Sequence, residues 1–244
     1  LFGLAQLSVY TLAYRLPEML LIGNLWVMGG VLFPAFSSIQ DKPEEMRRGL
    51  LAAVRIIQMI AVPISLGLFL AATPIVLVVF GDQWLEIVPI LRVLSIYAWI
   101  YSVGYHVGDI YKAIGRPDIL FRLTVLTLII IVPAILLGSR FGLVGVAWGH
   151  LIAVLIRRIV SLVVATRFIN VTTLEILSEI KPAAIAGEVL TPLVIGIQIF
   201  TSGFNPFFQL ILVVLSGAIG YLGTLWFIER ESLMRLIKMV GVPL

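Results

Sequence analysis

The stretch from Tyr10 to Gln40, YTLAYRLPEMLLIGNLWVMGGVLFPAFSSIQ, places one basic and one acidic residue inside a long apolar run. Arg15 and Glu18 are three residues apart, so on a helix they share one face. Pro17 lies between them and removes a backbone hydrogen bond, which predicts a kinked helix that faces a protein interior or a wet cavity. Ionisable residues inside a membrane helix are functional candidates, although these two could simply pair with each other or with a neighbouring helix.

The composition of the chain predicts an integral membrane protein. Its 244 residues are 61% hydrophobic and 12% charged, and their mean hydropathy is +1.12, whereas soluble domains are about 45–50% apolar and 25% charged. At about 20 residues per crossing, the chain can hold about seven or eight transmembrane helices and has no room for a soluble domain. The lack of cysteine excludes disulfides and thiol chemistry, and the scattered basic residues argue against nucleic-acid binding.

Apolar runs and the residues that interrupt them predict an all-α integral membrane fold, a bundle of about seven transmembrane helices. The predicted spans are residues 4–35, 49–80, 87–111, 119–138, 143–166, 182–201 and 207–228, and residues 229–244 form an amphipathic tail on the membrane face. Before the second span, Asp41 is expected to cap a helix with Pro43 in its first turn.

Proline and glycine inside the spans predict broken and closely packed helices. The prolines are Pro17, Pro63, Pro133 and Pro192, and the glycines, all in the fifth span, are Gly142, Gly145 and Gly149.

Basic residues in the connections predict the orientation of the chain. Ten lysines and arginines lie in the first, third and fifth connections and the tail, against only Arg140 in the three connections between them. This bias places the first connection and the C-terminus in the cytoplasm. The chain then begins on the outer side, and it opens on Leu1 without a signal peptide, so we expect a longer protein with a further part before it.

A second polar stripe follows the third span at spacings of four, three, four and three. Its residues are Ser95, Trp99, Ser102, His106 and Asp109, which lie on one face of an unbroken helix. His106 and Asp109 could bind or relay a proton, because an imidazole beside a carboxylate titrates near neutral pH. Asp109 could instead pair with Lys112, which lies one turn further along the chain.

Other charged residues inside the spans have simpler readings. Glu188, the lone acid of the sixth span, is expected to be a partner for a neighbouring helix. Arg157 and Arg158 lie where long side chains can reach the headgroups, and phosphate binding is the alternative. We find no phosphate loop and no H-E-x-x-H motif, and the histidines lack metal-ligand spacing, so the sequence predicts no enzyme, cofactor or metal site.

Four motifs carry a family resemblance: LxxYTLAYRLP at residues 7–17, VLFPAFSSIQ at 31–40, FGDQW at 80–84 and AIGRP at 113–117. In this order they resemble the Wzx-type polysaccharide flippases, whose superfamily includes lipid II flippases and multidrug-and-toxin extrusion transporters. The resemblance implies about fourteen helices in two lobes around a central cavity, working by alternating access. The implied cargo is an undecaprenyl-pyrophosphate-linked polysaccharide repeat unit for exopolysaccharide, lipopolysaccharide or O-antigen synthesis.

The resemblance also implies a place and a substrate site for this chain. The chain would be the second lobe of such a flippase in the bacterial cytoplasmic membrane, and the first lobe would be the missing N-terminal part of the same protein. Arg15 best fits the basic cavity residue that holds the pyrophosphate, and Glu18, Thr11 and Tyr14 complete the candidate binding set. The implied partners are the lipid-linked oligosaccharide, the membrane, a polysaccharide polymerase and the export machinery.

Two other functions remain open from the residues alone. A cation-coupled multidrug exporter would need a compact acidic ion site, for which Glu18 and Asp109 are available. Together with His106, these residues are the candidates for ion or proton coupling. An integral-membrane glycosyl- or acyltransferase would need a catalytic loop, and no predicted outer connection is long enough to hold one.

Overall fold

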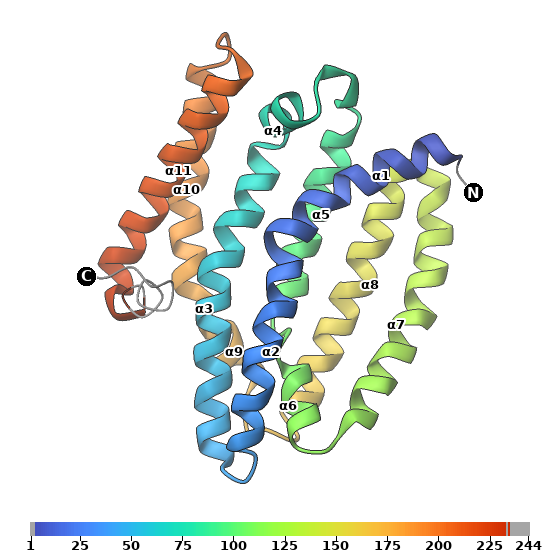
Figure 1. Cartoon of the computed structure of the whole chain (residues 1–244), viewed down its shortest axis with the longest axis vertical. Coiled ribbons are helices and arrows are strands. Elements are labelled where there is room, and N and C mark those ends of the chain that lie inside the picture. The colour runs from blue at the N-terminus through green and yellow to red at the C-terminus, as the bar shows by residue number, and fades with distance from the viewer. Residues whose placement is uncertain (1–2, 233, 235–244) are drawn as a thin grey trace.

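The computed structural model describes residues 3–232 and residue 234, and every regular element in that part of the chain is a helix. The long helices run side by side in one bundle (Figure 1). Six stretches of the described chain are long and apolar enough to cross a membrane, and the longest, Pro117–Ala165, contains two of the long helices. The predicted all-α integral membrane fold is confirmed.

The helices follow one another with short connections. They are α1 (Leu4–Pro17), the π-helical turn η1 (Glu18–Ile22), α2 (Gly23–Ser38), α3 (Pro43–Leu70), α4 (Ala72–Val79), α5 (Ile87–Ser102), α6 (Val107–Ala113), α7 (Pro117–Gly138), α8 (Gly142–Ala165), α9 (Thr173–Ser178), α10 (Lys181–Phe200) and α11 (Pro206–Ile228), with 3-10 turns at Asp82–Trp84 and Ser139–Phe141. The long helices lie within a few residues of the predicted spans, and the crossings themselves stay a prediction. Most of the predicted amphipathic tail lies outside the described residues.

α5 is the centre of the bundle. Its residues Ile87, Leu91 and Leu94 are fully buried, and the helix packs against α1, α3 and α8. α10 and α11 form a hairpin that packs on α3 and α4, at the left of Figure 1. The bundle therefore has a well-packed interior around α5, and α1 covers only one side of it.

The connections fall at two ends of the bundle. Those after α2, α6 and α8 lie at the lower end of Figure 1, and those after α4, α7 and α10 lie at the upper end. The three lower connections are the ones in which the basic residues are concentrated. This arrangement is the one that the positive-inside rule requires, while the side of the membrane that each end faces stays a prediction.

Only one of the predicted proline breaks is present. The π-helical turn follows Pro17 directly, the N–H of Gly23 bonds to the Glu18 carbonyl, and α1 leans away from α2 there (Figure 1). Pro63, Pro133 and Pro192 lie inside continuous helices, so the prediction of breaks at these three prolines is wrong. A proline removes one hydrogen bond, and the surrounding packing allows the helix to continue.

Two further breaks occur, the first of them three residues before Pro74, whose missing N–H cannot bond the Leu70 carbonyl at the end of α3. α3 gives way to α4 at Ala71, and residues 103–106 separate α5 from α6. In the second break Gly104 has a φ of +62°, which a residue with a Cβ adopts only with strain. The third predicted span is therefore a discontinuous helix.

The predicted cap at the start of α3 is also wrong. Pro43 occupies the first turn as expected, but the N-cap residue is Lys42 and no side chain caps the helix, so Asp41 does not have this role. A capping box forms instead at α9, where Thr172 and Glu175 each bond the backbone N–H of the other. A threonine three residues before a glutamate is the sequence signature of this motif.

Glycines bring α7 and α8 into backbone contact. A Cβ on Gly145 would lie 2.1 Å from the carbonyl oxygen of Gly138, and one on Gly149 would lie 2.5 Å from that of Ala134. Backbone atoms cannot move aside without separating the helices. The predicted close packing of the fifth span is confirmed for this pair.

We expect Gly145→Leu to lower the yield of folded protein clearly, because overpacking costs roughly 1–3 kcal/mol or more and each 1.4 kcal/mol is about a tenfold change in the folding equilibrium constant. Size-exclusion chromatography of a fluorescent fusion measures this yield. Gly196→Leu is the matched control, because a Cβ at Gly196 meets nothing within 4 Å. A normal yield of the Gly145→Leu protein would contradict the close contact.

Candidate functional site

α1 and the π-helical turn present an exposed polar face. The opposite side of α1 packs into the core through Val9 and Ala13, which are buried. The exposed polar residues are Ser8, Thr11, Arg15 and Glu18. The spacing of these residues by three and four places them on one side of the helix, as the sequence predicted.

The hydroxyl groups of this face use their hydrogens within the helix, so toward a ligand they can only accept hydrogen bonds. Ser8 Oγ donates to the Leu4 carbonyl at 3.0 Å, and Thr11 Oγ1 donates to the Leu7 carbonyl at 2.8 Å. Each hydroxyl oxygen keeps lone pairs that can accept a hydrogen bond from a ligand. The face therefore combines the donors of a guanidinium with acceptor oxygens one turn away.

Arg15 and Glu18 do not pair. Neither makes an ion pair or a hydrogen bond through its side chain with any residue in the described part of the chain. The reading in which they simply neutralise each other is not what this structure shows. A guanidinium has five N–H donors and stays charged, so Arg15 is free to bind an anion.

Tyr14 lies at the border of the polar face and is half-buried. Its ring lies parallel to that of His150, with 6.1 Å between centroids, and tilts against Tyr97 at 6.0 Å. The hydroxyl of Tyr10 lies 3.2 Å from Nδ1 of His150. The structure thus joins Tyr14 mainly to a partly buried aromatic cluster of α1, α5 and α8, which the sequence analysis missed.

The polar stripe of the third span is divided by the helix break. Above the break, Trp99 donates to Gln58 of α3 at 3.0 Å, and Gln58 donates to Ser102 at 3.0 Å. Below the break, His106 and Asp109 face α2, where a Cβ on Gly29 would lie 3.5 Å from an Asp109 oxygen. The prediction of one continuous face is wrong because residues 103–106 interrupt the helix, and the side chains before and after them contact different helices, α3 and α2.

Asp109 contacts both of the partners that the sequence offered. Its Oδ2 lies 2.7 Å from His106 Nδ1, and its Oδ1 accepts from Lys112 Nζ at 3.0 Å. His106 is 1% exposed, and its Nε2 has no partner among the described residues. The geometry therefore allows both the proton-relay reading and the pairing reading.

The two groups of candidates are separate. Gly29, which contacts Asp109, follows Glu18 by eleven residues, or roughly 16 Å of helix at 1.5 Å per residue. The polar face of α1 and the His106–Asp109 pair therefore do not form one compact site.

Arg158 is a functional candidate that sequence reasoning placed wrongly. It is 6% exposed, donates to the carbonyl of Tyr101 in the last turn of α5, and lies over the rings of Tyr101 and Tyr105. A cation is favourable at the negative C-terminal end of a helix dipole. The prediction that Arg158 reaches the headgroups is wrong. Its spacing of four from Val154 and three from Ser161, both buried, places it on the buried face of α8, and this spacing was visible in the sequence.

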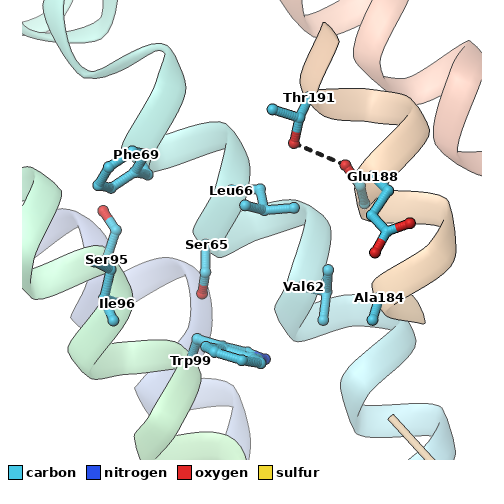
Figure 2. Close-up of a pocket in the computed structure, with 11 residues that line it drawn as sticks. Val62, Ser65, Leu66, Phe69, Ser95, Ile96, Trp99, Ala184, Glu188 and Thr191 are labelled. Carbon is cyan, nitrogen blue, oxygen red and sulfur yellow. Dashed lines mark hydrogen bonds between the residues drawn. The ribbon is translucent and has the colours of Figure 1, made fainter. Parts of the chain in front are cut away.

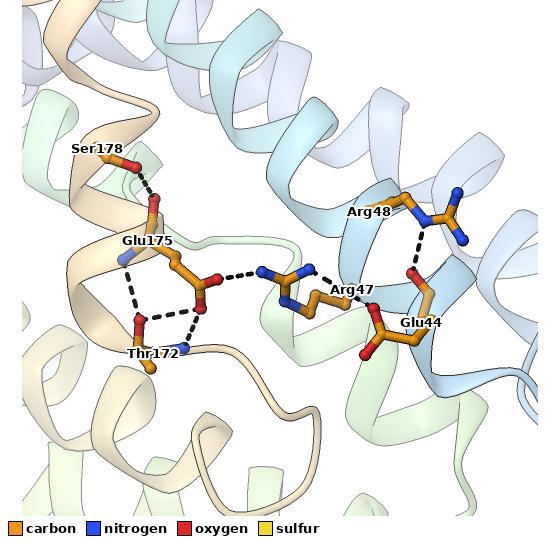
Figure 3. Close-up of polar contacts among 6 residues, drawn as sticks. All are labelled: Glu44, Arg47, Arg48, Thr172, Glu175 and Ser178. Carbon is orange, nitrogen blue, oxygen red and sulfur yellow. Dashed lines mark hydrogen bonds and ion pairs between the residues drawn. The ribbon is translucent and has the colours of Figure 1, made fainter.

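Ion pairs join the segments at the basic end of the bundle. Arg47 of α3 pairs with Glu175 of α9, beside the capping box (Figure 3). Arg55 of α3 pairs with Glu179 at 2.5 Å and with Glu229, after α11, at 3.2 Å. α9 lies outside the predicted spans, and the Thr172 N–H together with Arg47 lowers the pKa of Glu175 to about 2. These pairs hold α3 against both ends of the α9 to α11 segment.

The fold defines a multi-pass helical membrane protein. It is similar to the structure of the lipid II flippase MurJ in its inward closed conformation, with a TM-score of 0.69 and 18% sequence identity. The alignment covers 95% of this chain and 49% of the MurJ chain. At this identity the likeness concerns the fold.

Sequence comparisons point to polysaccharide biosynthesis. Residues 1–89 match the family model described as polysaccharide biosynthesis protein. The chain is 32% identical over 162 residues to the lipopolysaccharide biosynthesis protein WzxC of Escherichia coli (strain K12), covering 66% of this chain and 33% of WzxC. It is 26% identical over 140 residues to the succinoglycan biosynthesis transport protein ExoT of Rhizobium meliloti (strain 1021), covering 57% of this chain and 28% of ExoT.

A third relative is the teichuronic acid biosynthesis protein TuaB of Bacillus subtilis (strain 168), with 29% identity over 119 residues, 49% of this chain and 25% of TuaB. The chain thus spans about a third or less of the length of these curated relatives. The resemblance to Wzx-type polysaccharide flippases, which the four sequence motifs indicated, is confirmed by these similarities.

Proposed function

We propose that this chain is one lobe, the second, of a flippase that moves undecaprenyl-pyrophosphate-linked polysaccharide repeat units across the bacterial cytoplasmic membrane. Its role would be in exopolysaccharide or O-antigen synthesis. The proposal is supported by the relatives in polysaccharide biosynthesis and by the fold, which corresponds to about half of the MurJ chain. The observation that carries it is the unpaired Arg15 and Glu18 on one exposed face of a chain that is otherwise strongly apolar.

In this proposal the polar face of α1 lines the cavity between two lobes. The Arg15 guanidinium binds the pyrophosphate with two parallel charge-assisted hydrogen bonds, which its planar fork favours. The Thr11 oxygen accepts a hydrogen bond from the sugar or from water, and the Tyr14 ring supports the helix at the border of the face. Glu18 lies on the same face three residues further along the chain and makes no pair with Arg15 in this structure, so the guanidinium stays open to the pyrophosphate.

Coupling to an ion or proton involves Glu18, His106 and Asp109 in this proposal. Glu18 is exposed on the substrate face, whereas His106 and Asp109 form a buried pair that a proton could reach through Nε2 of His106. A pair beside a helix break is suited to this role, because discontinuous helices form ion sites in many transporters. The C-terminus lies in the cytoplasm, as the basic end of the bundle suggests.

Transport is favoured over the two alternatives. A cation-coupled drug exporter is disfavoured because the relatives named above carry the names of polysaccharide biosynthesis and transport proteins and not of drug exporters. A glycosyl- or acyltransferase would need a catalytic constellation, and the relatives carry the names of biosynthesis, transport and flippase proteins. We therefore propose that the protein is not an enzyme. A polysaccharide polymerase and the export machinery would act after it.

Deleting the gene of the whole protein tests the proposal. Cells should lose the surface polysaccharide and accumulate undecaprenyl-linked repeat units in the cytoplasmic leaflet, and a plasmid copy should reverse both effects. The accumulated lipid is measured by extraction and mass spectrometry, and its leaflet by accessibility to an added glycosidase. Unchanged polysaccharide together with greater drug sensitivity would favour the exporter instead.

A further inference from the structure

A cavity of about 450 Å³ lies between α3, α5 and α10. None of its lining residues comes from α1 or the π-helical turn, so it is distinct from the proposed substrate face. Figure 2 shows the side chains that surround it, most of which are apolar. The lining residues with polar atoms in their side chains are Ser65, Ser95, Trp99, Glu188 and Thr191.

Ser65 contributes a hydroxyl group without a partner. The residue is 6% exposed, and its Oγ makes no hydrogen bond with any described residue. Its side chain points toward Trp99 across the cavity wall (Figure 2). A buried hydroxyl without a hydrogen-bond partner is unfavourable, so a ligand atom in the cavity that contacts Ser65 Oγ would be stabilised.

Glu188 contributes a carboxylate without a cation. It lies seven residues into α10, roughly 10 Å along the helix at 1.5 Å per residue. Its side chain has no ion pair or hydrogen bond with the described residues, so the neighbouring-helix partner expected from the sequence is not present there. Glu188 is exposed, so its carboxylate is accessible to a cation, and an unpaired charge on an apolar membrane helix favours binding one.

The remaining polar groups of the cavity also suit a positive ligand. Ser95 and Thr191 donate to carbonyls of their own helices at 2.7 and 2.8 Å, so their oxygens can only accept from the cavity side. The Trp99 N–H is used by Gln58, which leaves the indole face as an electron-rich surface that attracts cations. Oxygen acceptors, one negative charge and an aromatic face select against an anion.

We propose that this cavity binds a monovalent metal cation of the sodium type, with Glu188 supplying the charge and Ser65 a hydroxyl oxygen. A single carboxylate matches a single positive charge, whereas a divalent ion takes several carboxylate or carbonyl ligands. The volume leaves room for some of the water shell of the ion. Gly187 allows α10 to approach α3, since a Cβ there would lie 2.7 Å from Leu66. The bound cation would link α10 to α3 and α5.

The purified whole protein in detergent provides the test, because binding can be measured without transport. Adding NaCl, against N-methylglucamine chloride at equal ionic strength, should raise the melting temperature by several degrees, as any ligand of the folded state does. Glu188→Gln should abolish the shift, and Ser65→Ala should move its midpoint to about tenfold more sodium, a loss of one ligand bond. Glu86→Gln, an exposed acid outside the cavity, should leave the shift unchanged.

A single-tryptophan protein that keeps only Trp99 gives a second measurement if Glu188→Gln does not fold. Sodium should change its fluorescence, and Ser65→Ala should weaken that response. An unaltered sodium shift in Glu188→Gln, or no response of the unmodified protein to sodium, would overturn the proposal, as would a response to pH alone. The site does not rest on the proposed function: a protein that binds sodium through Glu188 but flips no lipid would retain this site and lose that function.

Discussion

Arg15→Ala should nearly abolish polysaccharide export while leaving normal amounts of protein in the membrane. The substitution removes a guanidinium that makes no ion pair with the described residues, so the fold loses little. The substrate would lose two charge-assisted hydrogen bonds, each worth roughly 1.5–3 kcal/mol, which predicts at least about a hundredfold weaker binding of the pyrophosphate. Complementation of a flippase-null strain, read beside a blot of the membrane fraction, measures both quantities.

Related variants separate the charge of Arg15 from its shape. Arg15→Lys keeps the charge but loses the planar fork, so export should stay clearly impaired. Glu18→Gln should have a smaller effect, unless Glu18 is the proton site. Arg92→Ala is the matched control, because Arg92 is also an exposed arginine on a long helix but lies outside the polar face of α1. Full complementation by a well-expressed Arg15→Ala protein would remove Arg15 from the substrate site.

The helices could be predicted because their signal is local. An apolar run of about 20 residues has to satisfy its backbone hydrogen bonds within itself, so its length and flanking residues define a membrane helix. The polar face of Thr11, Arg15 and Glu18 was equally visible, since spacings of three and four place side chains on one side of a helix whatever surrounds it. Packing by Gly145 followed from the small size of the residue.

The features that were missed depend on contacts between distant segments. The break at residues 103–106 has no proline, and it is accompanied by Arg158, 57 residues from the Tyr101 carbonyl that it contacts. Likewise, Arg55 pairs with Glu179, which lies 124 residues further along the chain. A sequence lists these charges but does not say which helices adjoin, so Arg158 was assigned to the headgroups although it lies in the core.

Asp109→Asn is expected to produce the second large loss of transport. Asp109 is 6% exposed and binds the buried His106 as well as Lys112. Removing one partner of a buried charged pair costs roughly 3–5 kcal/mol in general, and the cost should be nearer the lower figure because Lys112 is half exposed and can turn to the headgroups. We therefore expect at least about a tenfold loss of export per cell, assayed by the same complementation.

Two readings of Asp109, proton relay and structural pairing, predict different causes for the loss of export. Measuring folded protein and export per folded molecule separates them. If the carboxylate carries a proton, Asp109→Asn should fold and export little per folded molecule, because asparagine keeps the shape but cannot exchange a proton. If it only holds His106 and Lys112, folded protein and export should fall together. Lys112→Gln is the control for the exposed half of the pairing, and exposed ion pairs contribute about 1 kcal/mol or less, so its export should fall little. Normal export and normal folding of Asp109→Asn would contradict both readings. Each reading requires the negative charge of Asp109, either to exchange a proton or to hold His106 and Lys112.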